Sequence, residues 1–152
     1  MIRVLFICHG NICRSPMAEF VLKDMVEKRN IADRFHIESA ATSREEIGNP
    51  VHTGTRNKLA QYGISTSGKY ARQVTKKDYK EYDYLLVMDD RNVTNIKKIT
   101  GEDKDKKIYK LLEFAGSKRD IADPWYTGNF DVTYDDIVEG CEAFLKHIEK
   151  SE

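Results

Sequence analysis

The stretch Ile2-Arg-Val-Leu-Phe-Ile-Cys-His-Gly-Asn-Ile-Cys-Arg-Ser-Pro16 decides the fold of this chain. Its apolar run from Ile2 to Ile7 predicts a strand buried on both faces, which is the pattern of a parallel sheet. Ser15 and Pro16 predict a helix start, because serine caps helix N-termini and proline suits the first helical position. The stretch therefore predicts a strand, a short loop and a helix.

Strands and helices are predicted to alternate along the rest of the chain. Apolar runs predict strands at residues 35–40, 82–88 and, more weakly, 106–111. A first helix is predicted from residue 16 to about residue 29, and a second follows the loop at residues 43–52 and ends at Tyr62, before Gly63. Two more are predicted from Asp89 or Asp90 to Gly101 and from Thr133 onward. This alternation predicts one α/β domain over residues 1–152: a three-layer, flavodoxin-like or Rossmann-like sandwich. Its four-stranded parallel sheet, ordered 2-1-3-4, has helices on both faces.

The composition excludes several classes of protein. Lys+Arg and Asp+Glu both number 25, so the formal charge is zero, which argues against bulk binding of nucleic acid or anionic membranes. No apolar run approaches the ~20 residues that a membrane span needs, and the N-terminus lacks the features of a signal peptide. The few cysteines predict no disulfide framework, which favours a reducing, cytoplasmic location. The four histidines are not spaced from the three cysteines as metal ligands would be, so no metal site is predicted. The cysteines are Cys8, Cys13 and Cys141, and the histidines are His9, His36, His52 and His147.

The loop after the first strand has the features of an anion-binding site. Ligands of open parallel sheets gather beyond the carboxyl ends of the strands, and a helix N-terminus favours negative charge. Gly10 and Asn11 tolerate the left-handed backbone of a tight loop, and Arg14 offers a planar fork of donors to phosphate oxygens. Cys8 lies at the floor of the site, where a thiolate would be stabilised. The loop therefore predicts a nucleophile for phosphoryl transfer, with phosphate bound by Cys8, His9, Gly10, Asn11, Ile12, Cys13, Arg14 and Ser15.

The segment Val4-Leu-Phe-Ile-Cys-His-Gly-Asn-Ile-Cys-Arg-Ser-Pro-Met-Ala-Glu19 resembles the signature of the low-molecular-weight protein tyrosine phosphatases. Further blocks match in the family's order and span nearly the whole chain, at residues 38–43, 47–50, 71–73, 83–89 and 122–126. The resemblance implies hydrolysis of phosphotyrosine proteins or peptides and of small aryl phosphates through a cysteinyl-phosphate. It implies no cofactor, inorganic phosphate as product and competitive ligand, and a monomer or weak dimer.

Roles for individual residues follow from the same resemblance. Cys8 would be the nucleophile, Arg14 the phosphate clamp, and Asp123 the general acid and then base, in a segment stiffened by the following proline. Ser15 would donate a hydrogen bond to the sulfur. Asn11 would hold the shape of the loop, braced by Ser39 from the second strand. The pocket would be walled by Trp125 and Tyr126, with His9, Glu46 and Ile47 along its rim.

Two departures from the family pattern affect these roles. Lys69 stands where the family often has a histidine that braces the phosphate loop. Glu45 stands where some members have an aromatic rim residue, and Trp125 replaces a common tyrosine. The acidic pair Glu45-Glu46 is expected to disfavour strongly acidic peptides.

The loop also has other interpretations. Two sulfurs, Cys8 and Cys13, on one phosphate loop could close reversibly under peroxide, or Cys13 could simply pack the loop. Arsenate reductase uses the same fold and a similar loop, but its chemistry needs further cysteines, and Cys141 is predicted to be buried on the last helix. A non-catalytic phosphotyrosine-binding module would lack the nucleophile or the acid, and both are present.

Overall fold

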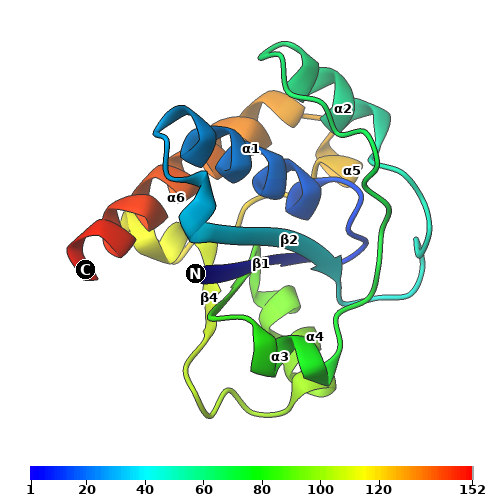
Figure 1. Cartoon of the computed structure of the whole chain (residues 1–152). Coiled ribbons are helices and arrows are strands. Elements are labelled where there is room, and N and C mark those ends of the chain that lie inside the picture. Colours follow the sequence, from blue (N-terminus) through cyan, green and yellow to red (C-terminus); the bar gives the residue numbers. More distant parts are fainter. Residues whose placement is uncertain (152) are drawn as a thin grey trace.

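The computed structural model describes residues 1–151 and contains a four-stranded parallel sheet in the order β2-β1-β3-β4. Its strands are β1 (Ile2–Cys8), β2 (Phe35–Ala41), β3 (Tyr84–Val87) and β4 (Ile108–Lys110). β1 is central and pairs in parallel with β2, from Ile2 opposite Phe35 to Cys8 opposite Ala41, and with β3 on its other side. The predicted strand order is confirmed (Figure 1).

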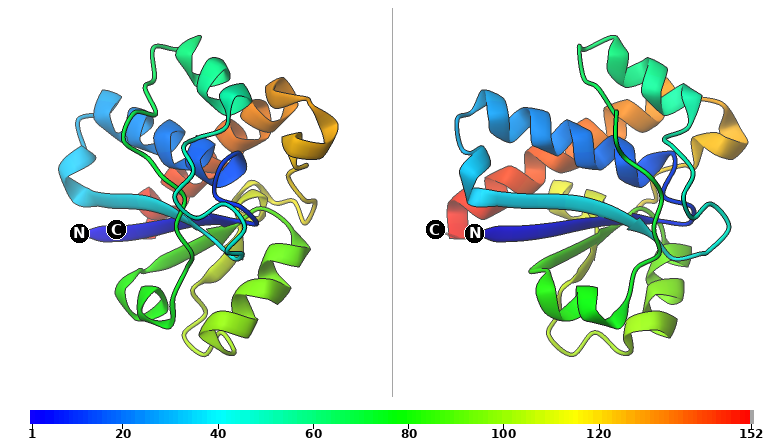
Figure 2. Two further views of the ribbon diagram at one scale, coloured as in Figure 1. Left: turned by 90° about the vertical axis from the view of Figure 1, so that its right-hand side faces the viewer. Right: turned by 45° about the vertical axis from the view of Figure 1, so that its right-hand side comes forward.

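Helices cover both faces of this sheet, as predicted. One face carries α1 (Arg14–Lys28) and α6 (Phe130–Ser151), and the other carries α3 (Lys76–Glu81) and α4 (Asp90–Thr100), as Figures 1 and 2 show. The remaining elements are short; they are η1 (Ala32–Arg34), α2 (Thr53–Ala60), η2 (Leu111–Ala115) and α5 (Pro124–Thr127). The α/β fold class is therefore confirmed.

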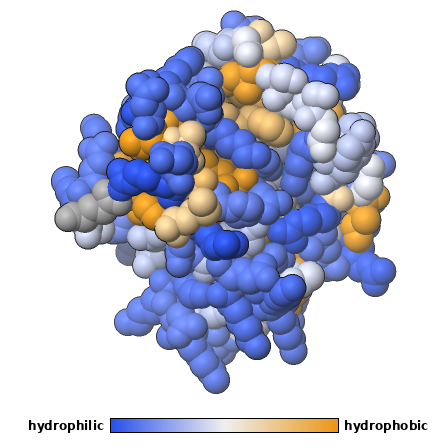
Figure 3. Space-filling view, in the orientation of Figure 1, coloured by the Kyte–Doolittle hydropathy of each residue, from blue (hydrophilic) through white to orange (hydrophobic). Residues whose placement is uncertain are grey.

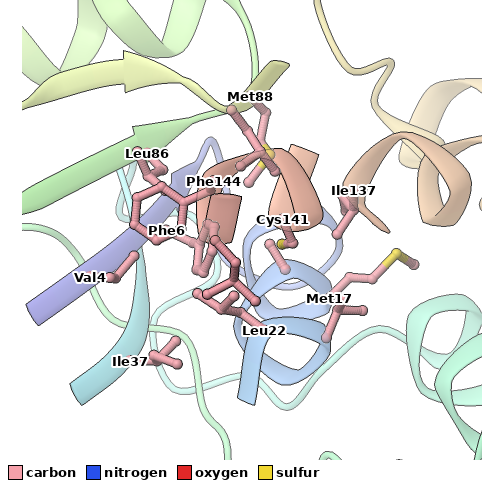
Figure 4. Packing of buried hydrophobic residues seen from close by; sticks show 14 of the residues in the cluster. Val4, Phe6, Met17, Leu22, Ile37, Leu86, Met88, Ile137, Cys141 and Phe144 are labelled. Atoms are coloured by element: carbon pink, nitrogen blue, oxygen red, sulfur yellow. The ribbon is translucent and has the colours of Figure 1, made fainter. Parts of the chain in front are cut away.

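Side-chain alternation along β1 divides the core into two layers. Val4 and Phe6 belong to the layer under α1 and α6, whereas Leu5 and Ile7 belong to the layer under α3 and α4, and all four are fully buried. Figure 4 shows the first layer, with Phe6 near side chains of both covering helices. Cys8 has the parity of Val4 and Phe6, so its side chain lies on the α1 side at the carboxyl edge of the sheet.

The last helix places the third cysteine in this core. Cys141 is completely buried in the same cluster as Phe144 and Ile137. Burial raises the pKa of the Cys141 thiol well above its ordinary value. The expectation that this cysteine is a core residue is confirmed.

The structure corrects the predicted start of the first helix. α1 begins at Arg14, and its N-cap residue Cys13 makes no side-chain capping bond. The prediction that Ser15 caps the helix is wrong, because its hydroxyl group lies 3.0 Å from the Cys8 sulfur instead. Asp89 does cap α4, accepting the Asn92 N–H at 2.8 Å.

Other helices also differ from the sequence-based expectations. α2 ends at Ala60, two residues before the predicted end at Tyr62. The last helix begins at Phe130, three residues earlier than predicted. α3 was not predicted; its six residues are too few to show an apolar period, but Thr75 and Asp78 form a capping box at its start.

The surface is mostly polar. Figure 3 shows a largely hydrophilic face on which apolar side chains form small, separate groups. Within residues 1–151, none of the helices has the length and the apolar character that crossing a membrane requires.

Candidate active site

The loop between β1 and α1 is held from outside through its carbonyl groups. The Cys8 and His9 carbonyls accept N–H groups that follow β2, and the Ile12 and Cys13 carbonyls accept donors at the start of α2. These donors are Thr42 N at 2.9 Å, Ser43 N at 3.0 Å, His52 N at 2.9 Å and Thr55 Oγ1 at 3.1 Å. With its carbonyls bonded outward, the loop turns N–H groups inward.

The Cys8 sulfur is the centre of this loop. The N–H groups of Asn11 and Ser15 donate to it at 3.3 and 3.4 Å, and the Ser15 hydroxyl group lies at 3.0 Å. The sulfur also lies near the start of α1, where the helix dipole favours negative charge. Donors converging on a sulfur in this way stabilise a thiolate.

Asn11 contacts several parts of the loop and its surroundings. Its backbone has a left-handed φ of 60°, which asparagine tolerates better than most residues. Its side-chain amide donates to Ser15 Oγ at 2.8 Å and to Ser39 Oγ at 2.9 Å. Its Oδ1 accepts the Arg72 N–H at 3.3 Å. The structure thus joins Asn11, Ser15 and Ser39 in one network.

Arg14 lies beside the sulfur and is only 2 % exposed. Its Nη1 donates to Asp89 Oδ2 at 2.7 Å and to the Ile121 carbonyl at 2.9 Å, and its Nη2 donates to Asp123 Oδ2 at 3.4 Å. Burial by itself lowers the pKa of Arg14, but Cys8, Asp89 and Asp123 outweigh it and the pKa is raised. Within residues 1–151, the other two of the five N–H donors of the guanidinium group make no hydrogen bond.

Asp89 is a site residue that the sequence reasoning missed. The sequence indicates only a helix cap at this position. In the structure, one carboxylate oxygen accepts the Asn92 N–H and the other accepts a hydrogen bond from the Arg14 guanidinium group. The signal was present in the sequence: Asp89 follows β3, and in a sheet of order 2-1-3-4 the carboxyl end of β3 adjoins that of β1.

Asp123 reaches the site from a distant segment. It is the N-cap of α5, where its Oδ1 accepts the Trp125 N–H at 3.1 Å while its Oδ2 faces Arg14. The segment before it is fixed by the Ile121 N–H, which donates to the Met88 carbonyl at 2.9 Å. The structure thus brings Cys8, Arg14 and Asp123 together.

A cavity of about 120 Å³ opens above the sulfur. Cys8 and Asp123 line it, and Trp125 and Tyr126, which are 56 % and 80 % exposed, form one wall. His9, Glu45 and Glu46 also line it, and the Glu45 carboxylate lies 2.7 Å from His9 Nε2. Ile47, which the resemblance placed on the rim, is not among the lining residues.

Cys13 lines the same cavity but differs chemically from Cys8. It is buried, and burial, followed by the influence of Cys8 and Asp123, raises the pKa of its thiol to about 12. Cys13 is therefore a protonated thiol at neutral pH. Within residues 1–151, no group of three or more histidine, cysteine or acidic side chains is arranged to hold a metal ion.

The parallel α/β sheet, the thiol in the loop after its first strand, and the arginine and aspartate beside that thiol are the features expected of the small tyrosine phosphatases that the sequence resembles. Residues 3–152 match the family described as low molecular weight phosphotyrosine protein phosphatase. The chain belongs to this family, whose members are hydrolases.

Known relatives agree over nearly their whole length. The low molecular weight protein-tyrosine-phosphatase YfkJ of Bacillus subtilis is 40 % identical over 99 % of this chain and 97 % of its own. Its crystal structure superposes with a TM-score of 0.95, covering 100 % of this chain and 97 % of that one. The structure of SP-PTP, from Streptococcus pyogenes, is 43 % identical, with a TM-score of 0.87 over 97 % and 93 % of the two chains.

Proposed function

We propose that this protein hydrolyses phosphotyrosine in proteins and peptides, and small aryl phosphates, through a cysteinyl-phosphate intermediate. The observation that carries the proposal is the environment of the Cys8 sulfur. It receives N–H groups and a hydroxyl group, and it shares one cavity with Asp123. Arg14 lies beside both. A nucleophile, an anion clamp and an acid are the three parts that such a reaction needs.

In the first step, the Cys8 thiolate attacks phosphorus while the bond from phosphorus to the phenolic oxygen breaks. Arg14 and the inward N–H groups of the loop bind the phosphoryl oxygens and stabilise their charge. Asp123, in its protonated form, donates its proton to the departing phenolate oxygen. The products of this step are the free phenol and phosphocysteine, with Asp123 left as a carboxylate.

In the second step, water attacks the phosphorus of phosphocysteine. The Asp123 carboxylate accepts a proton from this water, and the S–P bond breaks to give inorganic phosphate and the thiolate. The Ser15 hydroxyl group, 3.0 Å from the sulfur, donates to the departing thiolate. Phosphate is then a product that competes with substrate for the same loop. The side chains of the site supply each role, so we propose a reaction that uses neither a metal nor a cofactor.

The cavity walls suggest which phosphoproteins are accepted. Trp125 and Tyr126 present exposed aromatic faces on which a phenyl ring can stack. Glu45 and Glu46 place negative charge at the mouth, which opposes peptides with acidic residues next to the phosphotyrosine. We further propose that the protein acts in the cytoplasm, as one domain and as a monomer or weak dimer.

Asp123→Asn tests the acid. Asparagine keeps the cap on α5 but has no proton to donate to the leaving group. We expect kcat to fall by about 10²–10⁴-fold while KM changes little. The loss should be larger for phenyl phosphate than for p-nitrophenyl phosphate, whose leaving group needs less protonation. Steady-state kinetics on both esters measure this, and equal losses on the two would remove Asp123 from the acid role.

The two alternatives fit the structure less well. An arsenate reductase needs a cysteine that carries a disulfide away from the loop, and Cys141 is fully buried in the core. A binding module without catalysis has no use for an aspartate held beside the arginine clamp, yet Asp123 lies 3.4 Å from Arg14. We therefore propose the phosphatase reaction rather than either alternative.

Cys13 is proposed to protect the nucleophile from irreversible oxidation. Peroxide would convert the Cys8 thiolate to a sulfenic acid, which condenses with the Cys13 thiol to form a disulfide and water. After a brief peroxide treatment, dithiothreitol should restore most activity to the parent and less than half as much to Cys13→Ala. Cys141→Ala is the control and should recover like the parent. Full recovery of Cys13→Ala would leave Cys13 as a packing residue.

A further inference from the structure

The His52 ring supports the aromatic wall of the cavity from behind. His52 is the N-cap of α2, and the start of α2 lies close to α5, which carries Trp125 (Figure 1). The two rings meet edge to face, with centroids 5.6 Å apart and planes at 76°. Trp125 lines the cavity, whereas His52 is not among the lining residues. His52 therefore contacts the wall from outside the cavity.

Three contacts fix the place of His52. Its Nδ1 accepts the Gly54 N–H at 2.9 Å, which sets the orientation of the ring at the start of α2. The ring also stacks on that of Phe130, the first residue of α6, with centroids 5.5 Å apart and planes within 15° of parallel. The His52 N–H donates to the Ile12 carbonyl of the phosphate loop at 2.9 Å. The residue is thus tied to α2, to α6 and to the loop after β1.

The stacking of Phe130 on His52 depends on a glycine. A Cβ atom at residue 54 would overlap the Phe130 ring, so a larger residue there would push that ring away. Glycine is a poor helix former, and at this position in α2 it gives the Phe130 ring the room to reach His52. The stack is therefore a close-packed arrangement that places the His52 ring.

Trp125 has little other support. It is 56 % exposed, and its backbone N–H donates to Asp123 Oδ1 at 3.1 Å, a bond that leaves the side chain free to rotate. Within residues 1–151, no ring other than that of His52 contacts the indole. A half-exposed side chain with one ring contact can turn when that contact is removed. The orientation of the Trp125 ring therefore depends on His52.

A wall that is already in place binds an aromatic ring more tightly, because less side-chain entropy is lost when the ligand arrives. We propose that His52 is a positioning residue for substrate recognition. It holds the Trp125 ring as a wall of the cavity, and so favours phosphate esters of phenols over those of aliphatic alcohols. The inference rests on the proposed function in that it takes the ring of the substrate to pack on Trp125.

Two substitutions separate the ring of His52 from its capping atom. His52→Asn keeps an acceptor for the Gly54 N–H, since asparagine is a good N-cap, but it removes the ring. His52→Phe keeps a ring against Phe130 and Trp125 but removes the acceptor. Both variants keep the backbone N–H that donates to Ile12. The proposal expects the wall to loosen in His52→Asn and to stay in place in His52→Phe.

The first measurement is fluorescence. Trp125 is the only tryptophan of the chain, so its emission reports on this wall alone. We expect His52→Asn to raise the bimolecular rate constant for quenching by acrylamide, determined from fluorescence lifetimes, because the indole becomes more accessible. The fast component of the anisotropy decay should grow as well, because the ring moves more freely. His52→Phe should stay close to the parent in both.

The second measurement is binding of phosphonates, whose C–P bond is not hydrolysed. By isothermal titration calorimetry, His52→Asn should bind phenylphosphonate about 2- to 10-fold more weakly than the parent does, which is the contribution of one aromatic ring pair. Its affinity for methylphosphonate, which has no ring to pack on the wall, should stay close to that of the parent. In steady-state kinetics, KM for phenyl phosphate should rise by the same factor as the phenylphosphonate affinity falls, with kcat nearly unchanged.

Tyr62 provides a matched control. Its ring stacks on that of Tyr134 at 4.5 Å, so it also joins the end of α2 to α6, but neither tyrosine lines the cavity. Tyr62→Leu should leave both the quenching of Trp125 and the ratio of the two phosphonate affinities at the parent values. If Tyr62→Leu changes them as much as His52→Asn does, the effect is a general loosening of α2 and the proposal is overturned.

A double variant tests whether His52 acts through Trp125. In a Trp125→Leu background, His52→Asn should leave phenylphosphonate binding unchanged, because the wall that it supports is absent. An equal loss of affinity in both backgrounds would overturn the proposal, as would unchanged quenching of Trp125 in His52→Asn. Should His52→Asn fail to fold, Phe130→Leu removes the ring that backs His52 and should raise the quenching rate constant; no rise would count against the proposal in the same way.

The parent protein separates this inference from the proposed function. If the parent binds phenylphosphonate no better than methylphosphonate, there is no aromatic wall for His52 to hold, and the inference is overturned. If it prefers phenylphosphonate but hydrolyses no aryl phosphate, the proposed function fails, while the fluorescence and binding data still decide the role of His52.

Discussion

Cys8→Ser is expected to lower the turnover of p-nitrophenyl phosphate by about 10⁴-fold or more. The N–H groups of Asn11 and Ser15 donate to the Cys8 sulfur, and the Ser15 hydroxyl group, which can donate to a thiolate, lies 3.0 Å from it. Such surroundings stabilise an anion that is already formed, but they offer no base to a serine hydroxyl group, which does not ionise near neutral pH. The measurement is initial-rate kinetics at saturating substrate.

Binding and catalysis are separated by two accompanying measurements. Cys8→Ser should still bind inorganic phosphate by isothermal titration calorimetry, because Arg14 and the loop N–H groups remain. The parent, quenched in acid during turnover of a radiolabelled ester, should carry phosphate on Cys8, and the variant should carry none. Cys141→Ala removes a buried thiol that does not line the cavity and serves as the control for loss of a thiol. Turnover by Cys8→Ser within tenfold of the parent would contradict the cysteinyl-phosphate mechanism.

Arg14→Lys should have the second largest effect. Lysine keeps a positive charge but cannot present a fork of donors to two phosphoryl oxygens while it also holds Asp89 and the Ile121 carbonyl. An arginine that neutralises transition-state charge in phosphoryl transfer contributes about 10³–10⁵-fold to kcat. We expect kcat to fall by about 10³-fold, with weaker inhibition by phosphate, both measured by steady-state kinetics.

The chain offers a matched arginine for comparison. Arg119 also forms a forked pair, with Asp136 at 3.0 and 2.7 Å, but at the surface and outside the cavity. Arg119→Lys should leave kcat within twofold of the parent. If Arg14→Lys behaves the same way, the fork is not required and the phosphate clamp is assigned to the wrong residue.

Much of the fold was predictable because the relevant information is local. The run from Ile2 to Ile7 is apolar at every position except Arg3, and only a strand covered on both faces buries such a run. Alternation with helices then restricts the sheet to a parallel one. The loop was predictable for the same reason, since Cys8, Arg14 and Ser15 lie within eight consecutive residues and the helix start fixes their geometry.

Other features depended on contacts between distant segments. α3 is too short for an apolar period, and the role of Ser15 differed from a cap because a sulfur lay within its reach. The place of Asp123 came from the family resemblance, because an aspartate before a proline is by itself an ordinary turn. The sequence also does not show which residues of this rim face the cavity: Glu45 and Glu46 line it, and Ile47 is not among the lining residues.

The sequence by itself determined the parallel α/β sheet and the loop that carries Cys8 between a strand and a helix, because burial pattern and helix initiation act over a few neighbouring residues. Only the tertiary structure decided what surrounds that loop. Asp89 and Asp123 reach Arg14 from 75 and 109 residues away, and Lys69 reaches Ser39 from 30 residues away. The physical reason is the sheet order, which places the carboxyl ends of β1 and β3 side by side, together with the path of residues 64–74, which are bonded to the end of β2.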